Sequence, residues 1–261
     1  MATPRAVVLR TAGTNCDVET RFALELAGAQ AELMHINRLA AEDDPLGGFQ
    51  LLALPGGFTY GDDVAAGKVM AIELQHVLGD ELVRFVESGG LVIGICNGFQ
   101  VLVKMGLLPD ATFVGPGARK ATLTVNDSHR FEARWVRLRA AENTHCVFVA
   151  PGEELELPVA HGEGKLVTRT PEVLSDLVSA GQIAYRYASN QGRTPAYPED
   201  PNGSVDHIAG LCDPSGRVFG LMPHPERHIF PTQHPEWTRG RPQAASGSVI
   251  FERAVSAAKA L

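Results

Sequence analysis

The alternation of short apolar runs with amphipathic stretches over the first hundred residues constrains the fold most. The apolar runs read AVVLR, AELMHI, LLALPGG and LVIGIC, and amphipathic segments such as VETRFALELAGA and the stretch from Asp62 to Ser88 separate them. Strands and helices that alternate in this way build β-α-β units around a parallel sheet. Gly28 and Gly89-Gly90 follow two of the expected helices, where helices commonly end. The sequence therefore predicts an α/β fold with an open, mostly parallel twisted sheet and helices on both faces.

The pattern changes from about Ala121 onward. The runs ATLTV, RWVRLRA, CVFVA and QIAYRYA are shorter and alternate with polar residues, which predicts additional short antiparallel or mixed strands that extend or flank the first sheet. Residues 190–205 are rich in Pro, Gly and Asn and are expected to form a long loop, and loops of that length are often functional. Residues 229–246 should be irregular before SGSVIFERAVSAAKAL closes the chain as a helix. We expect one domain over residues 1–261.

Composition excludes several classes of function. With 30 acidic and 23 basic residues the net charge is -7, and no run of Lys or Arg provides a phosphate-binding stripe, so nucleic acid is not an expected partner. No apolar segment is long enough for a signal peptide or a membrane span. The four cysteines are scattered without a CxxC pair, so we expect neither a zinc site nor a disulfide scaffold. These features predict a cytoplasmic protein that binds no metal and no membrane.

The segment LVIGICNGFQVLVKMG combines an apolar strand, the turn GICNG and a helical pattern. A nucleophile on such a turn is held in a strained, exposed position, and Gly94 and Gly98 avoid clashes two residues before and after Cys96. The N-terminus of the following helix favours a thiolate, and the Asn97 amide N–H is the expected first oxyanion donor. A lone cysteine is otherwise most often a buried structural thiol. The interpretation of Cys96 as a nucleophile therefore requires a base elsewhere in the chain.

The segment VFGLMPHPERH offers that base. His224 follows an apolar strand, lies between Pro223 and Pro225, and precedes Glu226 by two positions. The prolines stiffen the segment, so an imidazole and a carboxylate can be held in a fixed relation. Together with a thiol they make the nucleophile, base and orienting group of a catalytic triad. The alternative is a proline-rich turn with His and Glu on the surface.

A third segment, LLALPGGFTYGDD, runs from an apolar strand into Gly56, Gly57 and Phe58. Two glycines there let backbone N–H groups turn toward a ligand, which makes this loop the candidate for the second oxyanion donor. A simple Gly-Gly turn is the alternative.

Taken together, PGG, GICNG and MPHPE in this order resemble the class I, or triad-type, glutamine amidotransferases, whose fold is flavodoxin-like. Further segments resemble the family of glutaminase subunits of phosphoribosylformylglycinamidine synthase. The resemblance extends from about residue 5 to residue 258, and its segments are GTNCD, LPGGFTYGDD, GICNGFQ, AHGEGK, YPEDPNGS, IAGLCDPSGRVFG and LMPHPER.

This resemblance implies that the chain hydrolyses L-glutamine and passes the ammonia to a large synthetase subunit, with a small accessory subunit in the complex. The partner would convert formylglycinamide ribonucleotide to the amidine in purine synthesis with ATP and Mg²⁺. This chain would carry no cofactor, in agreement with its lack of a phosphate-binding glycine loop. The resemblance implies Cys96 as nucleophile, His224 as general acid and base, and Glu226 as its orienting group. It also places Gly57, Phe58 and Asn97 in the oxyanion region and Gln100 near bound glutamine.

Some features leave alternatives open. The segment His161-Gly162-Glu163-Gly164 is expected to have a structural or partner-facing role near the pocket, because one His and one Glu make a poor ligand set for a metal. The chain is longer than short members of the family between about residues 109 and 134 and after Ile229, which leaves the partner interface undefined. The alternative functions are a glutaminase for another synthetase, a catalytically silent binding module, and a redox or chaperone-like protein with the same cysteine turn.

Overall fold

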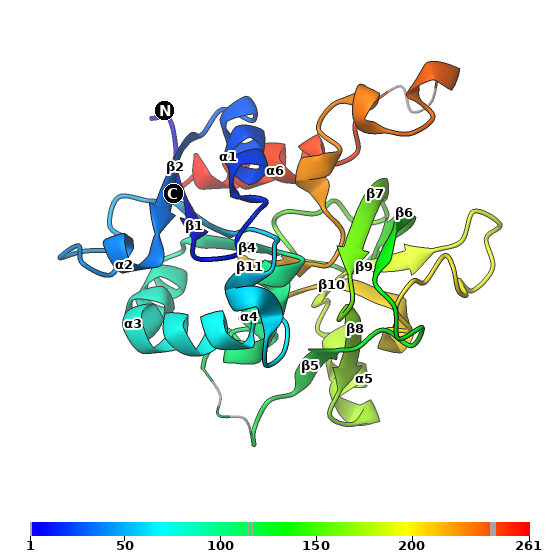
Figure 1. The fold of residues 1–261 in the computed structure, drawn as a ribbon, viewed down its shortest axis with the longest axis horizontal. Helices are drawn as coiled ribbons and strands as arrows, with labels where there is room; N and C mark the ends of the chain where they lie inside the picture. The colour runs from blue at the N-terminus through cyan, green and yellow to red at the C-terminus, as the bar shows by residue number, and fades with distance from the viewer. Residues whose placement is uncertain (1, 114, 116, 241–243) are drawn as a thin grey trace.

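A nine-stranded sheet in the order β2-β1-β3-β4-β11-β10-β9-β6-β7 organises the chain. The computed structural model describes residues 2–113, 115, 117–240 and 244–261 (Figure 1). One half of the sheet is parallel and consists of β2 (Gln30–His35), β1 (Arg5–Arg10), β3 (Leu51–Leu54), β4 (Leu91–Ile95) and β11 (Val218–Leu221). The other half is antiparallel and consists of β10 (Ile208–Cys212), β9 (Ile183–Ala188), β6 (Glu132–Ala140) and β7 (Glu154–His161).

Helices cover both faces of the parallel half, which is why the sequences of β3 and β4 are apolar without alternation and buried throughout. α1 (Asp17–Leu26) and α6 (Ser248–Ala258) pack together on one face. α3 (Lys68–Glu87) and α4 (Asn97–Met105) pack together on the other (Figure 1). The short helix α2 (Ile36–Leu39) follows β2. The predicted fold class is confirmed.

The antiparallel half shows the expected polar alternation, since β6 and β7 bury alternate residues. A separate two-stranded sheet pairs β5 (Ala121–Thr124) with β8 (Lys165–Thr168), and α5 (Pro171–Ser179) follows it. The predicted strands at ATLTV, RWVRLRA and QIAYRYA are therefore confirmed, as is the closing helix. The segments at 109–134 and after 229 contain β5, the start of β6 and two short 3-10 turns, whereas residues 114, 116 and 241–243 lie outside the described part of the chain.

The prediction of a strand at CVFVA was wrong. Cys146, Phe148 and Val149 are buried, but they form a loop in which the Val149 N–H donates to Cys146 O and the Val147 N–H donates to Gly216 O. Phe148 stacks on Phe219 of the central strand β11, so the apolar pattern reports burial and not strand pairing. The sequence analysis also assigned no strand to β7, which contains Pro158 and lies at the edge of the sheet, where a missing N–H is tolerated.

The parallel pairing of β3, β4 and β11 decides where the candidate residues meet. Strands that run in parallel end at the same edge of a sheet, so the segments after Leu54, Ile95 and Leu221 are neighbours. These segments are the three that the sequence analysis selected. Within the described ranges, no helix combines the length and apolar character that a membrane crossing needs.

Candidate active site

Cys96 forms the tight turn between β4 and α4 that the sequence predicts. Its backbone has φ 49° and ψ -104°, a strained conformation for a side-chain-bearing residue, and its N–H donates to Leu221 O at 2.7 Å. Gly98 is required by close contact, because a Cβ there would lie 1.9 Å from the backbone oxygen of Leu54. The strain therefore persists because β3, β4 and β11 hold the turn on three sides.

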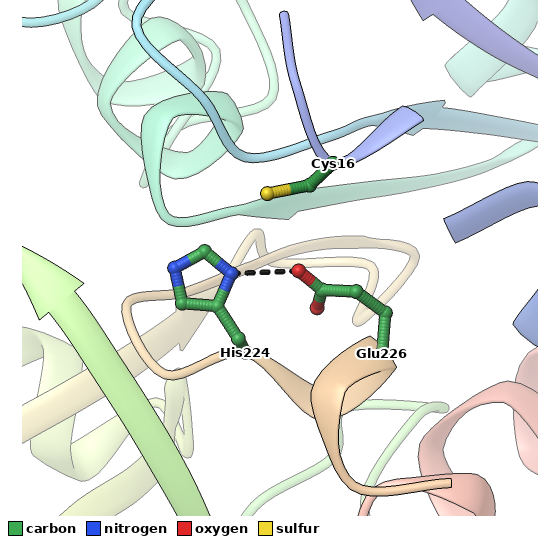
Figure 2. A group of neighbouring side chains, drawn as sticks. All are labelled: Cys16, His224 and Glu226. Atoms are coloured by element: carbon green, nitrogen blue, oxygen red, sulfur yellow. Dashed lines mark hydrogen bonds and ion pairs between the residues drawn. The ribbon is translucent and has the colours of Figure 1, made fainter. Parts of the chain in front are cut away.

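His224 follows β11 and meets Glu226 inside the protein. The His224 Nδ1 lies 2.6 Å from Glu226 Oε1, and the two side chains are 2% and 0% exposed (Figure 2). The His224 N–H donates to Pro158 O at 2.8 Å, so the edge strand β7 fixes the backbone of this segment. The alternative of a surface His and Glu is excluded by this burial.

The charge of the imidazole is controlled by its neighbours. Burial lowers the pKa of His224, but the Glu226 carboxylate and then the Cys96 sulfur outweigh burial and raise the pKa well above its ordinary value. The imidazole can therefore hold a proton, and Cys96 is among the neighbours that favour this protonated form. The Cys96 sulfur itself lies 3.6 Å from Ala160 O.

The loop after β3 also lies against the imidazole of His224. A Cβ at Gly56 would lie 2.7 Å from His224 Cε1, so only glycine leaves room for the ring. Gly57 has φ 145°, and the Phe58 N–H donates to Gly13 O at 2.9 Å. The Phe58 amide is thus already used, and Gly57 is the amide of this loop that can turn toward a substrate.

A cavity of about 220 Å³ opens beside Cys96. A cavity of this size fits an amino acid better than a nucleotide. Its walls come from the turn between β4 and α4, from the loop after β3 and from the end of β7. The lining residues are Gly57, Phe58, Asp62, Ala66, Cys96, Gln100, Phe131, Ala160, His161, Gly162 and Glu163.

The amide side chains of Asn97 and Gln100 form hydrogen bonds between the segments that line this cavity. Asn97 Oδ1 accepts from Thr59 Oγ1 at 2.7 Å, and Asn97 Nδ2 donates to Gln100 Oε1 at 2.9 Å and to Asp62 Oδ1 at 3.1 Å. Gln100 Nε2 donates in turn to Glu163 O at 2.6 Å. The side chains of Asn97 and Gln100 therefore hold the pocket in shape, and Asn97 retains its helix-terminal N–H for a ligand.

Carboxylates bring negative charge to this pocket. Glu163 accepts from the Ala66 N–H at 3.2 Å and pairs with buried Lys104 at 3.4 Å. Burial raises the pKa of Asp62, which lies on the same side. The sequence analysis gave Asp62 and Glu163 no contact with substrate, although they stand in the quoted segments LPGGFTYGDD and AHGEGK.

A larger cavity of about 500 Å³ lies over β6 and β9 and has a different character. Its arginines are paired with acids, as in Arg186 with Asp206 at 2.5 Å and Arg193 with Glu199 at 3.1 Å. No cysteine or histidine lines it among the described residues. The smaller cavity beside Cys96 is therefore the candidate active site.

A second sulfur reaches the same imidazole. Cys16 immediately precedes α1 and is 1% exposed, and its sulfur, a ring nitrogen of His224 and a carboxylate oxygen of Glu226 all lie within 4.8 Å of one another (Figure 2). Cys16 stands in the quoted segment GTNCD, but the sequence analysis gave it no role because no local feature distinguishes it from a structural cysteine.

Comparisons with known proteins agree with this geometry. Residues 3–256 match the model of the CobB/CobQ-like glutamine amidotransferase domain. The subunit PurQ of phosphoribosylformylglycinamidine synthase from Dehalococcoides mccartyi is 48% identical over 260 residues, which cover 99% of both chains. The corresponding subunit from Treponema denticola is 43% identical over 87% of this chain and 88% of that one.

Solved structures give the same picture. A chain in the structure of PurLQS from Thermotoga maritima is similar with a TM-score of 0.74 and 33% identity, over 98% of this chain and 99% of that one. A glutamine amidotransferase from Thermotoga maritima has a TM-score of 0.51 at 14% identity, over 100% of this chain and 94% of that chain. The latter similarity concerns the fold alone.

Proposed function

The chain belongs to the family of CobB/CobQ-like glutamine amidotransferase domains, and we propose that it is the glutaminase subunit of a phosphoribosylformylglycinamidine synthase. The observation that carries this proposal is the buried His224–Glu226 pair next to the strained turn at Cys96, within a chain whose relatives match it over nearly its full length. Cys96 is the nucleophile, His224 the general acid and base, and Glu226 the group that orients the imidazole.

The first half of the reaction forms a thioester. The Cys96 thiolate attacks the side-chain carboxamide carbon of glutamine, and the negative charge moves to the carboxamide oxygen. The N–H groups of Asn97 and Gly57 face this oxygen and stabilise the charge. When the tetrahedral intermediate collapses, the proton on His224 Nε2 passes to the amine, ammonia leaves, and a γ-glutamyl thioester remains on Cys96.

The second half returns the enzyme to its starting state. His224, now neutral, takes a proton from water, and the hydroxide attacks the thioester carbon. The second tetrahedral intermediate uses the same two N–H donors, and its collapse releases glutamate and the Cys96 thiolate. Glu226 stays ionised throughout and stabilises the imidazolium each time it forms.

The pocket itself fits an amino acid with one free ammonium group. Asp62 and Glu163 lie on its wall and supply negative charge where the α-ammonium of glutamine would bind.

We assign ATP and Mg²⁺ to the partner synthetase, so this chain binds glutamine and no cofactor. The name PurLQS describes three kinds of subunit in the Thermotoga maritima assembly. We extend that arrangement to this chain, which would deliver ammonia to a PurL-like synthetase in the presence of a small PurS-like subunit. The four free cysteines suit a reducing cytoplasm.

Glutamate release from glutamine tests the proposal. The wild-type chain and the variant Cys96→Ala are each measured alone and with the PurL-like and PurS-like subunits, formylglycinamide ribonucleotide, ATP and Mg²⁺. We expect low activity of the wild-type chain alone, strong stimulation in the mixture, and at least about a 10⁴-fold loss in the variant.

Two outcomes would change the assignment. A wild-type chain that hydrolyses glutamine but ignores these partners is a glutaminase of another synthetase. Wild-type turnover in the Cys96→Ala variant would contradict the assignment of Cys96 as the nucleophile of a triad. A folded wild-type chain that never releases glutamate would favour the catalytically silent binding module.

A further inference from the structure

Cys16, His224 and Glu226 form a second cluster around the catalytic imidazole, which the reaction above does not use as a unit. Cys16 arrives from the start of α1, while His224 and Glu226 arrive from the segment after β11 (Figure 2). One possible ligand atom from each side chain lies within 4.8 Å of the other two, and all three side chains are buried. Sulfur, imidazole nitrogen and carboxylate oxygen are the atoms that bind zinc in proteins.

The present contacts of this cluster leave ligand capacity unused. Within the part of the chain that the structure describes, Glu226 Oε2 is buried without a hydrogen-bond partner and can turn to an ion, while His224 Nδ1 hydrogen-bonds with Glu226 Oε1 alone. The Cys16 thiol donates to Asn15 Oδ1 at 3.3 Å, and its sulfur accepts from Arg227 Nη2 at 3.1 Å. The arginine is itself paired with Glu19 at 3.3 Å, and burial raises the pKa of the Cys16 thiol despite this nearby positive charge, so the thiol gives up its proton only when a cation binds.

The geometry points to an inhibitory binding site for a thiophilic divalent cation, with zinc as the fitting ion and Cys16, His224 and Glu226 as the three protein ligands. In tetrahedral zinc sites such atoms lie about 3.4–3.6 Å apart. On binding, His224 Nδ1 and Glu226 Oε1, now 2.6 Å apart, would separate by about 0.8 Å to admit the ion, and the Cys16 sulfur would move toward them. A fourth position would be filled by water.

Charge balance supports this site in a buried position. On binding, the Cys16 S–H proton and the proton on His224 Nδ1 pass to solvent, and the ring keeps its proton on Nε2. The cation, one thiolate, one carboxylate and a neutral imidazole then carry no net charge, so their mutual attraction offsets part of the cost of burying an ion.

The consequence for catalysis rests on the proposed function. A cation on His224 Nδ1 would break the hydrogen bond to Glu226 and hold the ring in the tautomer whose Nε2 carries the proton. The imidazole could then no longer accept a proton, so the cation would inhibit glutamine hydrolysis reversibly, and a chelator would restore it. This differs from an ion bound between Cys96 and His224, because Cys96 is not a ligand.

Cobalt titration of the full chain tests the site without using activity. Co²⁺ occupies zinc sites and shows a sulfur-to-cobalt absorption band when a cysteine binds it. We expect one Co²⁺ per chain with this band in the wild type and in Cys96→Ala, and its displacement by Zn²⁺. The band should disappear in Cys16→Ser. Glu226→Gln should weaken the affinity for Co²⁺ about 10-fold to 100-fold or more, because replacing even a side chain that only hydrogen-bonds to a metal ligand weakens metal binding by that factor.

Matched controls separate this site from the other thiols. Cys146→Ser changes another buried free cysteine and should leave both band and affinity unchanged. Circular dichroism and thermal melting show whether Cys16→Ser is folded; if it is not, Glu226→Gln and Cys96→Ala decide the question. A band that survives in folded Cys16→Ser, a band lost in Cys96→Ala, unchanged affinity in Glu226→Gln, or no band in the wild type would each overturn the proposal.

A parallel measurement separates the site from the function. Zn²⁺ should inhibit glutamate release by the complex, and Cys16→Ser should require at least about tenfold more Zn²⁺ for the same inhibition, in line with the loss of one direct ligand. If the chain binds Co²⁺ as described but no preparation releases glutamate, the metal site stands and the proposed glutaminase fails. If glutamate is released and the band is absent, the proposed glutaminase stands and the metal site fails.

Discussion

At the residue scale, the contact between His224 and Glu226 determines what the imidazole can do. The carboxylate meets Nδ1 and leaves Nε2 for the reacting groups. After burial, it is the largest influence on the pKa of His224 and the largest that raises it. The raised pKa favours the folded state fully below the ordinary value of about 6.5, and this contribution is lost as pH rises through the raised pKa of the folded state.

We predict that Glu226→Gln lowers kcat about 10²–10⁴-fold, because the amide keeps the shape of the side chain but cannot stabilise the imidazolium. The pKa of His224 should fall, so the pH dependence of kcat should change as well as its size. Steady-state glutaminase assays of the complex over a pH series measure both effects. Glu32→Gln, which removes a surface carboxylate from β2, is the matched control. Wild-type kcat and pH profile in Glu226→Gln would contradict the orienting role.

The sequence could predict the site residues whose functional pattern lies within one short segment. Cys96 has its glycines on either side and His224 has Glu226 two positions later, so the local pattern already contains the geometry. Cys16 and Glu163 carry no such signal, because their importance arises only when the start of α1 meets the segment after β11 and the segment after β7 meets α4. Tertiary contacts between distant segments cannot be obtained from spacing.

At the scale of elements, the strand-to-helix turn depends on how closely α4 approaches β3. We predict that Gly98→Ala destabilises the protein by about 1–3 kcal/mol, because its Cβ would lie 1.9 Å from a rigid backbone oxygen of Leu54. Displacement of α4 would also move Cys96 and Asn97, so turnover should fall. Urea unfolding and glutaminase assays measure the two effects.

Gly117→Ala is the control for this prediction, since no atom of the described residues lies within 4 Å of a Cβ at that position. This control should leave the free energy of unfolding nearly unchanged. Equal stability of the two alanine variants would show that the turn tolerates a side chain at Gly98.

The helices and strands were predicted well where a pattern of apolar residues corresponds to only one kind of element. The runs that became β1, β3 and β4 are apolar because both faces are covered, and α1, α3 and α6 follow from amphipathic stretches. The run CVFVA has the same composition as a strand, but Phe148 is buried as part of a loop. Periodicity detects burial, and burial without pairing gives the same signal.

At the scale of the whole molecule, the buried His161 couples stability to pH in the direction opposite to His224. Burial, with the nearby charge of His224, lowers the pKa of His161 to about 3, while its ordinary value in an unfolded chain is about 6.5. Between these values the unfolded chain binds a proton that the folded chain does not. Stability therefore falls as pH falls, by about 1.4 kcal/mol per pH unit from this group.

We predict that His161→Gln makes the loss of unfolding free energy between pH 6 and pH 4 shallower by about that slope, whatever its effect at neutral pH. Urea unfolding at a series of pH values gives the slopes directly. His76→Gln, at an exposed position on α3, should leave the slope of the wild type unchanged. Identical slopes in His161→Gln and the wild type would mean that the buried imidazole is protonated like a free one.

The position of β11 between β4 and β10 has a consequence for the chain during its synthesis. Cys96, the proposed nucleophile, is made early and His224, its proposed base, is made late, and the strand that precedes His224 also fills the centre of the sheet. A ribosome-bound chain that ends between Cys96 and His224 has neither the imidazole nor a complete sheet. The proposed active site therefore forms only when the last fifth of the protein, which includes β11, has folded into place.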